Sequence, residues 1–196
     1  MVRALEELLR LKKTIRVIGF DDAPFQKERG SPVKIAGVVC SDTRFEGMIW
    51  GEVTKDGTDA TEIIVKLLQG SKFYEQINVV LIDGIAVGGF NIIDLPGLSN
   101  DLNRPCLAVM RKYPDLQAVN KALMNFSDYQ QRKQLLVNAG KIYNHHTFYF
   151  QVSGCKPDTA ANVLNHITDR GHVPEALRLA HLIGAAIMTG ESSSRA

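Results

Sequence analysis

The chain has 196 residues and a formal net charge of only +2. Its length fits a single globular domain over residues 1–196, and a mean hydropathy of −0.06 argues against a disordered or membrane-embedded chain. No apolar run approaches the roughly 20 residues that a membrane-spanning helix needs. The charge neither demands nor excludes a nucleic-acid partner, because the local arrangement of basic residues matters more than their sum.

The N-terminal residues and the cysteines both indicate a cytoplasmic protein. Residues 2–13 carry charges throughout, unlike a signal peptide. Cys40, Cys106 and Cys155 are an odd number without a C-x-x-C pair, which disfavours a zinc site and a disulfide framework. Cys40 and Cys106 lie in apolar stretches, so we expect them to be buried, reduced thiols.

Hydrophobic periodicity predicts the helices and strands. Strands are expected over residues 15–20, 33–40, 45–53, 79–83, 105–110 and 147–152. Helices are expected over residues 2–13, 60–68, 92–102, 116–124, 129–139, 158–169 and 175–188. The Ser-rich C-terminal end is expected to fray.

The order of these elements predicts an α/β fold. Two strands joined by the polar turn at 41–44 indicate a hairpin, and later strands alternate with helices. We therefore expect a mixed sheet, antiparallel among the early strands and parallel among the later ones, with helices covering it.

Two of the predicted strands end in carboxylates. The apolar run at 79–82 leads into Asp83 and Gly84, and the strand at 15–20 leads into Asp21 and Asp22. Open α/β sheets place their ligands at the carboxyl ends of their strands. If these strands are neighbours, roughly 4.7–4.9 Å apart, their acidic tips can share a cation.

Mg²⁺ or Mn²⁺ is the expected occupant of such a site. Like charges held together raise one another's pKa, and a divalent cation removes that penalty. Metal ions at such a site activate water for phosphodiester cleavage. The ordinary alternative is that each aspartate caps a turn or the next helix. Asp22 and Asp94 are reserve ligands.

Several short motifs occur in an order that resembles a known superfamily. They are Ile18-Gly19-Phe20-Asp21, Leu81-Ile82-Asp83-Gly84, the strand at 105–110 followed by Arg111-Lys112, Val152-Ser153-Gly154, and the stretch from Pro174 to His181. Together they resemble the endonuclease V-like superfamily, and more closely its archaeal branch of unknown function, DUF99 or UPF0215. The likeness extends from Val17 to Ile183.

The resemblance implies a ribonuclease H-like fold and assigns roles to particular residues. Asp21 and Asp83 correspond to metal ligands, and Arg111 or Lys112 to a lysine that contacts the substrate. His181 corresponds to the last active-site residue, where it would shuttle a proton or position a water. Without the resemblance, a histidine on an amphipathic helix is more often a satisfied core or surface residue.

Two features depart from the superfamily's pattern. The nucleases carry a Glu before a helix, where this chain has only Asp59 or Asp56. Asp59 at the helix start is favoured as the substitute, although an N-cap is an equal alternative. The Pro-Tyr-Ile-Pro-Gly strip that reads a deaminated base is absent from residues 45–50, so specificity for inosine does not carry over.

These observations lead to one favoured function and two alternatives. The favoured one is a Mg²⁺- or Mn²⁺-dependent nuclease acting on DNA or RNA, with Asp21, Asp83, Asp59 and His181 as its catalytic groups. The first alternative is a non-catalytic nucleic-acid-binding protein that retains the nuclease fold. A weaker one is a hydrolase of a small phosphorylated metabolite.

Overall fold

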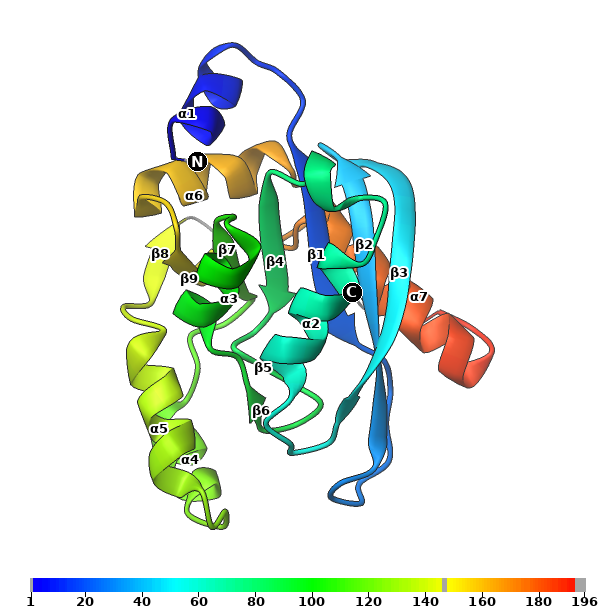
Figure 1. The fold of residues 1–196 in the computed structure, drawn as a ribbon, viewed down its shortest axis with the longest axis vertical. Coiled ribbons are helices and arrows are strands. Elements are labelled where there is room, and N and C mark those ends of the chain that lie inside the picture. Colours follow the sequence, from blue (N-terminus) through cyan, green and yellow to red (C-terminus); the bar gives the residue numbers. More distant parts are fainter. Residues whose placement is uncertain (1, 146–147, 193–196) are drawn as a thin grey trace.

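A central sheet with helices on both faces organises the chain (Figure 1). The computed structural model describes residues 2–145 and 148–192. The predicted mixed α/β sheet is confirmed. Residue 147 of the predicted strand at 147–152 and most of the Ser-rich end lie outside the described residues.

The helices and strands lie close to the predicted positions. The strands of the main sheet are β1 (Arg16–Asp22), β2 (Pro32–Ser41), β3 (Arg44–Thr54), β4 (Val79–Asp83), β7 (Cys106–Met110), β8 (Tyr143–His145) and β9 (Phe148–Ser153). The helices are α1 (Val2–Arg10), α2 (Ala60–Gln69), α3 (Leu95–Leu102), α4 (Leu116–Leu123), α5 (Tyr129–Asn138), α6 (Pro157–His166) and α7 (Glu175–Thr189), with the short 3₁₀ helix η1 (Tyr74–Gln76).

The sheet has the strand order β3-β2-β1-β4-β7-β9-β8. The hairpin predicted from the turn at 41–44 is confirmed as the antiparallel pair β2–β3, and β1 pairs antiparallel with β2. In the centre β1, β4 and β7 are parallel. The alternation of strands and helices predicted parallel later strands and not the antiparallel pairing of β9 with β7. The chain reaches β9 through β8, a short strand that was not predicted and that pairs antiparallel with β9.

Each face of the sheet has its own hydrophobic core. Side chains alternate between the two faces along a strand. In β1, Val17 packs on one face with α1, α6 and α7, whereas Ile18 and Phe20 pack on the other with α2 and α3. Burial of each such side chain contributes about 1.5–3 kcal/mol, so the alternation fixes which face every β1 residue occupies.

The glycine-rich stretch after β4 forms a small hairpin, β5 (Ala86–Val87) with β6 (Asn91–Ile92). Gly88 and Gly89 form its turn with φ of 59° and 88°, a conformation that costs glycine little. Figure 1 shows the hairpin at the end of the molecule where β1 and β4 finish.

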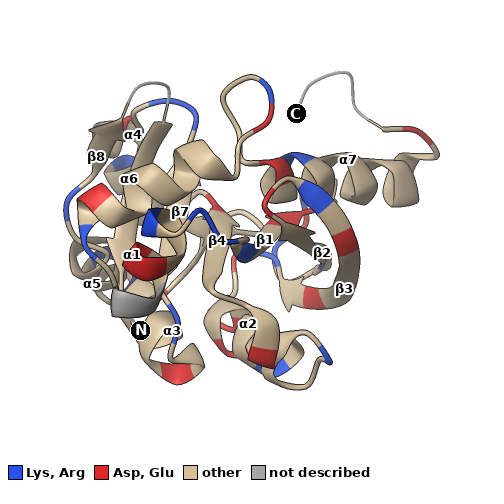
Figure 2. Ribbon diagram, turned by 90° about the horizontal axis from the view of Figure 1, so that it is seen from above, with Lys and Arg blue, Asp and Glu red and all other residues tan. Residues whose placement is uncertain are grey.

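The cysteines and the charged residues are distributed as the composition predicts. Cys40 and Cys106 are buried and free, as predicted. Figure 2 shows acidic and basic residues interspersed over the elements seen from above. Of the helices that the structure describes, not one combines the length and apolar character needed to cross a bilayer.

Candidate metal centre at the carboxyl ends of β1 and β4

Asp21 and Asp83 lie side by side at the ends of neighbouring parallel strands. In the β1–β4 register Phe20 pairs with Ile82, so each aspartate is the next residue along its strand. Phe20 and Ile82 belong to the same core. Because side chains alternate, both aspartates point to the opposite face, which α7 covers. The pairing of β1 with β4 therefore brings these two carboxylates together, as the sequence predicted.

Close packing of α7 on β1 brings His181 to Asp21. His181 Nδ1 lies 2.9 Å from Asp21 Oδ2, although the two residues are 160 positions apart. Gly19 allows this approach, because a Cβ there would lie 2.9 Å from the backbone of Ala176 and Leu177. His181 therefore lies next to the carboxylates, as predicted, because Gly19 lets α7 pack closely on β1.

Burial and like charge control the electrostatics of the carboxylates. Burial, followed by the charges of Asp83 and Asp22, raises the pKa of Asp21 to about 8. Burial also raises the pKa of Asp83, with Arg111 and His181 opposing it. The protein alone therefore does not fully compensate the charges of the ionised carboxylates, and a cation held between them would lower both pKa values.

Asp22 faces away from α7 and is held by the β5–β6 hairpin. Its Oδ2 accepts a 2.6 Å hydrogen bond from the backbone N–H of Gly88. Burial raises the pKa of Asp22, and this hydrogen bond opposes the rise. Asp94, the other reserve ligand, caps α3 by accepting a hydrogen bond from the N–H of Gly97. Asp94 therefore acts as a helix cap, the role given above as the alternative to metal binding.

Arg111 follows β7 and reaches the site from the next strand. Its Nη2 lies 3.5 Å from Asp83 Oδ2. Both side chains are partly accessible, with 38% and 22% exposed, so the contact is a loose one that a ligand can replace. Lys112 is exposed. Of the two residues predicted to contact the substrate, Arg111 is the one that touches a carboxylate of the site.

Asp59, the predicted substitute for the superfamily's Glu, lies in a hydrogen-bonded loop before α2. It accepts hydrogen bonds from the backbone and hydroxyl of Thr54 and a 2.6 Å bond from Asn91 Nδ2. Burial favours a higher pKa, but these hydrogen bonds outweigh it and hold the pKa of Asp59 below its usual value. Asp59 occupies the N-cap position of α2 without a side-chain capping bond.

Asp56, the alternative to Asp59, is also held by other partners. Its carboxylate lies 2.6 Å from Lys55 Nζ and accepts a 2.9 Å hydrogen bond from the N–H of Phe90. Its backbone N–H donates to the carbonyl of Gly88, whose own N–H donates to Asp22. The β5–β6 hairpin thus connects the Asp56 loop to the end of β1.

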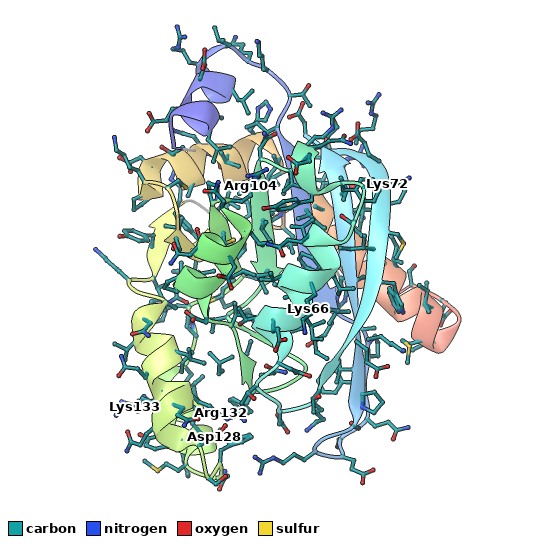
Figure 3. The ribbon with its side chains drawn as sticks, viewed as in Figure 1. Lys66, Lys72, Arg104, Asp128, Arg132 and Lys133 are labelled. Carbon is teal, nitrogen blue, oxygen red and sulfur yellow. The ribbon has the colours of Figure 1, made fainter. Side chains whose placement is uncertain are left out.

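Arg132 and Asn91 organise this loop, and the sequence did not single out either for that purpose. Arg132 is buried on α5 and donates to the carbonyls of Asp56, Gly57 and Phe90. Its Nε also bonds to Asp128, and Figure 3 shows the two at the same end of α5. The i,i+4 spacing of Asp128 and Arg132 is a detectable signal, but the carbonyl partners are not.

The donor set fits Mg²⁺ or Mn²⁺ held by few protein ligands. Among residues 2–145 and 148–192, no cluster of three or more His, Cys, Asp or Glu side chains is arranged to hold a metal ion. Asp21 and Asp83 supply two carboxylates, and Mg²⁺ sites commonly use one or two carboxylates and complete the shell with water and substrate phosphate oxygens. Once both carboxylates are ionised, their charge would suit such a cation.

Comparison with known proteins decides the family. Residues 13–188 match the model of the family described as Endonuclease dU. The chain belongs to the Endonuclease dU family. A UPF0215 protein of Methanothermobacter thermautotrophicus is 36% identical over 192 residues, which cover 95% of this chain and 94% of the relative. The predicted relationship to UPF0215 is therefore confirmed.

Solved structures agree with the family and with the fold. A protein of unknown function from Archaeoglobus fulgidus has a TM-score of 0.83 and 31% identity, covering 88% of this chain and 98% of that one. Endonuclease V of Ciona intestinalis, in complex with an inosine-containing DNA, has a TM-score of 0.57 and 16% identity, covering 91% and 92%. The latter likeness shows that this Endonuclease dU family member has the endonuclease V fold.

Proposed function

We propose that this Endonuclease dU family member is a divalent-metal-dependent endonuclease that hydrolyses phosphodiester bonds in nucleic acid. The observation that carries the proposal is the pair Asp21 and Asp83 on adjacent parallel strands, with His181 bonded to one carboxylate and Arg111 to the other. Family membership and the nuclease fold support the same reaction class.

Asp21 and Asp83 are the residues that would hold Mg²⁺ or Mn²⁺. When bound, such an ion supplies Lewis-acid stabilisation of phosphate oxygens and lowers the pKa of water. The raised pKa of Asp21 means that its proton must leave before the carboxylate can act as a ligand. To act as further ligands, Asp59 and Asp56 would have to give up hydrogen bonds that they accept from neighbouring residues.

His181 and Arg111 have complementary tasks in the proposed reaction. Because Nδ1 of His181 bonds to Asp21, Nε2 is the ring nitrogen left to orient a water or accept its proton. The Arg111 guanidinium can move from Asp83 to a phosphate oxygen, and its forked donors suit that geometry. Lys112 adds an exposed positive charge for the nucleic-acid backbone.

The substrate is proposed to be DNA or RNA, with deoxyuridine-containing DNA as the first candidate. The family description carries the abbreviation dU, which denotes deoxyuridine. The endonuclease V of Ciona intestinalis is described in complex with DNA. Inosine is a weaker candidate here because residues 45–50 lack the strip that reads a deaminated base.

A cleavage assay on a panel of labelled oligonucleotides tests the proposal. The panel holds DNA and RNA with deoxyuridine, inosine or no modification, with Mg²⁺, Mn²⁺ or EDTA. Asp83→Asn and Asp21→Asn are expected to abolish metal-dependent cleavage and to remain folded. Asp158→Asn, at an exposed position in the first turn of α6, is the matched control and should cleave normally. Full activity in Asp83→Asn would contradict the proposal.

One observation favours a second function, nucleic-acid binding without catalysis. The described residues contain no preformed cluster of three metal-ligating side chains. This function predicts salt-dependent binding of the same oligonucleotides, with no cleavage under either metal. The panel therefore separates the two functions directly.

A further inference from the structure

Arg132 is a buried cation that is fully engaged by protein partners. Its side chain is only 4% exposed, and its Nε lies 2.8 Å from Asp128 Oδ1. The other two nitrogens donate to backbone carbonyls, those of Asp56, Gly57 and Phe90. A guanidinium has a fixed set of donors, so one that is enclosed in this way orders the groups around it and does not contact a substrate.

Consecutive hydrogen bonds connect Arg132 to the carboxylate of Asp21. Arg132 Nη2 donates to the carbonyl of Asp56 over 2.9 Å, and the N–H of Asp56 donates to the carbonyl of Gly88 over 2.8 Å. The N–H of Gly88 donates to Asp22 Oδ2 over 2.6 Å, and the N–H of Asp22 donates to Asp21 Oδ1 over 2.8 Å. The guanidinium on α5 is therefore joined to the candidate metal centre through the β5–β6 hairpin and the end of β1.

The same hairpin is attached to Asp83, the second carboxylate. Asp83 is the last residue of β4, and β5 begins at Ala86. The strands β5 and β6 have two residues each, and so short a hairpin has little stability of its own. Its turn is held at Phe90, whose carbonyl accepts from Arg132 and whose N–H donates to Asp56 Oδ1 over 2.9 Å. The position of the hairpin therefore depends on these polar contacts.

We infer that Arg132 is a positioning residue, which anchors the β5–β6 hairpin so that the carboxylates of Asp21 and Asp83 keep the orientation that a metal ion requires. The inference rests on the proposed function and extends it to a buried side chain of α5 that acts only through other residues. Groups that orient metal ligands typically contribute roughly 10- to 100-fold to metal affinity or activity.

Removal of the guanidinium tests the inference in the full chain. At a temperature where Arg132→Ala is folded, its Mg²⁺ affinity in calorimetric titration and its kcat should each fall roughly 10- to 100-fold. Oligonucleotide affinity in EDTA should stay that of the wild type. In the metal-free protein the N–H of Gly88 should exchange with solvent faster, because the hairpin that carries it has lost its anchor.

Arg104→Ala is the matched control. Arg104 Nε also donates to a backbone carbonyl, that of Ile77, over 2.7 Å, and its guanidinium lies over an aromatic ring, as that of Arg132 does. Figure 3 shows Arg104 in the upper half of the molecule and Arg132 in the lower half. Arg104→Ala should keep the wild-type Mg²⁺ affinity, kcat and Gly88 exchange rate, even if its Tm falls.

Two further measurements separate positioning from a loss of stability. Arg132→Lys keeps the positive charge but has one nitrogen, which cannot replace the forked donors, so it should show the same losses in a less disrupted core. It carries the test if Arg132→Ala does not fold. Guanidinium ions, added far below denaturing concentrations, should restore part of the Mg²⁺ affinity of Arg132→Ala, whereas NaCl of equal ionic strength should not.

The outcomes distinguish this inference from the proposed function. Wild-type Mg²⁺ affinity and kcat in the Arg132 variants would overturn it, and so would comparable losses in Arg104→Ala. An unchanged exchange rate of the Gly88 N–H would overturn it as well. Faster exchange in the Arg132 variants alone supports the positioning role even if the wild type cleaves no oligonucleotide, in which case only the catalytic part of the proposed function fails.

Discussion

His181 and Asp21 share a 2.9 Å contact across 160 positions of sequence. A second histidine–aspartate contact of the same length joins His166 Nε2 to Asp42 Oδ1. The two pairs differ in surroundings. Asp21 is 8% exposed and lies beside Asp83, whereas Asp42 is 34% exposed in the β2–β3 turn, near the start of β1. Only the first pair combines a histidine with a buried carboxylate cluster.

Removal of the His181 imidazole is expected to slow catalysis. His181→Ala should lower kcat by roughly 10²–10⁴-fold, the usual contribution of a positioned acid or base. Oligonucleotide affinity should change little, because the cationic side chains of Arg111 and Lys112 remain. Cleavage rates at saturating substrate, with affinity measured in EDTA, check this expectation.

His166→Ala is the matched control for His181→Ala. It removes a histidine–aspartate contact of equal length at the far end of β1. We expect normal cleavage from this variant. Comparable losses in both variants would mean that the effect is structural and not specific to the metal centre.

The close contact of Gly19 with the backbone of α7 predicts that a methyl group added at residue 19 displaces α7 and, with it, His181. In Gly19→Ala the new Cβ would lie 2.9 Å from the carbonyl carbon of Ala176 and the nitrogen of Leu177, both in the backbone of α7. Overpacking of this kind costs about 1–3 kcal/mol of unfolding free energy. We expect a lower Tm and, at temperatures where the variant is folded, slower cleavage. A destabilised variant with a wild-type kcat would show that the placement of α7 is less critical.

The raised pKa of Asp21 predicts a pH-dependent stability in the metal-free protein. The folded-state pKa is about 8, while that of an unfolded aspartate is about 3.9. Between these values the folded state holds a proton that the unfolded chain has released. The free energy of unfolding therefore falls as the pH rises through this window and levels off above it.

Asp21→Asn should reduce this pH dependence, with the raised pKa values of Asp22 and Asp83 leaving a smaller one. We expect the variant to exceed the wild type in Tm at pH 8 and to differ less at pH 5, with EDTA present. Each kcal/mol corresponds to about 2–4 °C at this chain length. Thermal unfolding across the pH range, with Asp158→Asn as control, measures the effect. An unchanged pH slope in Asp21→Asn would contradict the assignment.

Asp59 can be tested as a structural or a metal-binding group. An asparagine there would place an amide N–H₂ against the donors of Thr54 or Asn91. From these hydrogen bonds we expect Asp59→Asn to lose about 1–3 kcal/mol of unfolding free energy and to keep the Mg²⁺ affinity of the wild type in calorimetric titration. A lower Mg²⁺ affinity with an unchanged Tm would instead identify Asp59 as the substitute for the superfamily's Glu.

Local patterns predicted most of the fold. Apolar runs and turn residues located β1, β4, β7 and the β2–β3 hairpin within a few residues. The short strands β5, β6 and β8 were missed, because strands of two or three residues have too little periodicity to detect. The antiparallel return of β9 depends on β8 and was missed for the same reason.

The sequence by itself determined which face of the sheet each strand side chain occupies. It also determined where the strands end. A carboxylate placed directly after a buried apolar run must emerge at the carboxyl end of its strand, which is why Asp21 and Asp83 were predictable. Tertiary structure alone decided which other groups surround them. His181 meets Asp21 only because Gly19 admits α7, and Asn91 and Arg132 engage the Asp59 and Asp56 loop only after distant segments pack. Local periodicity carries no information on contacts between residues this far apart.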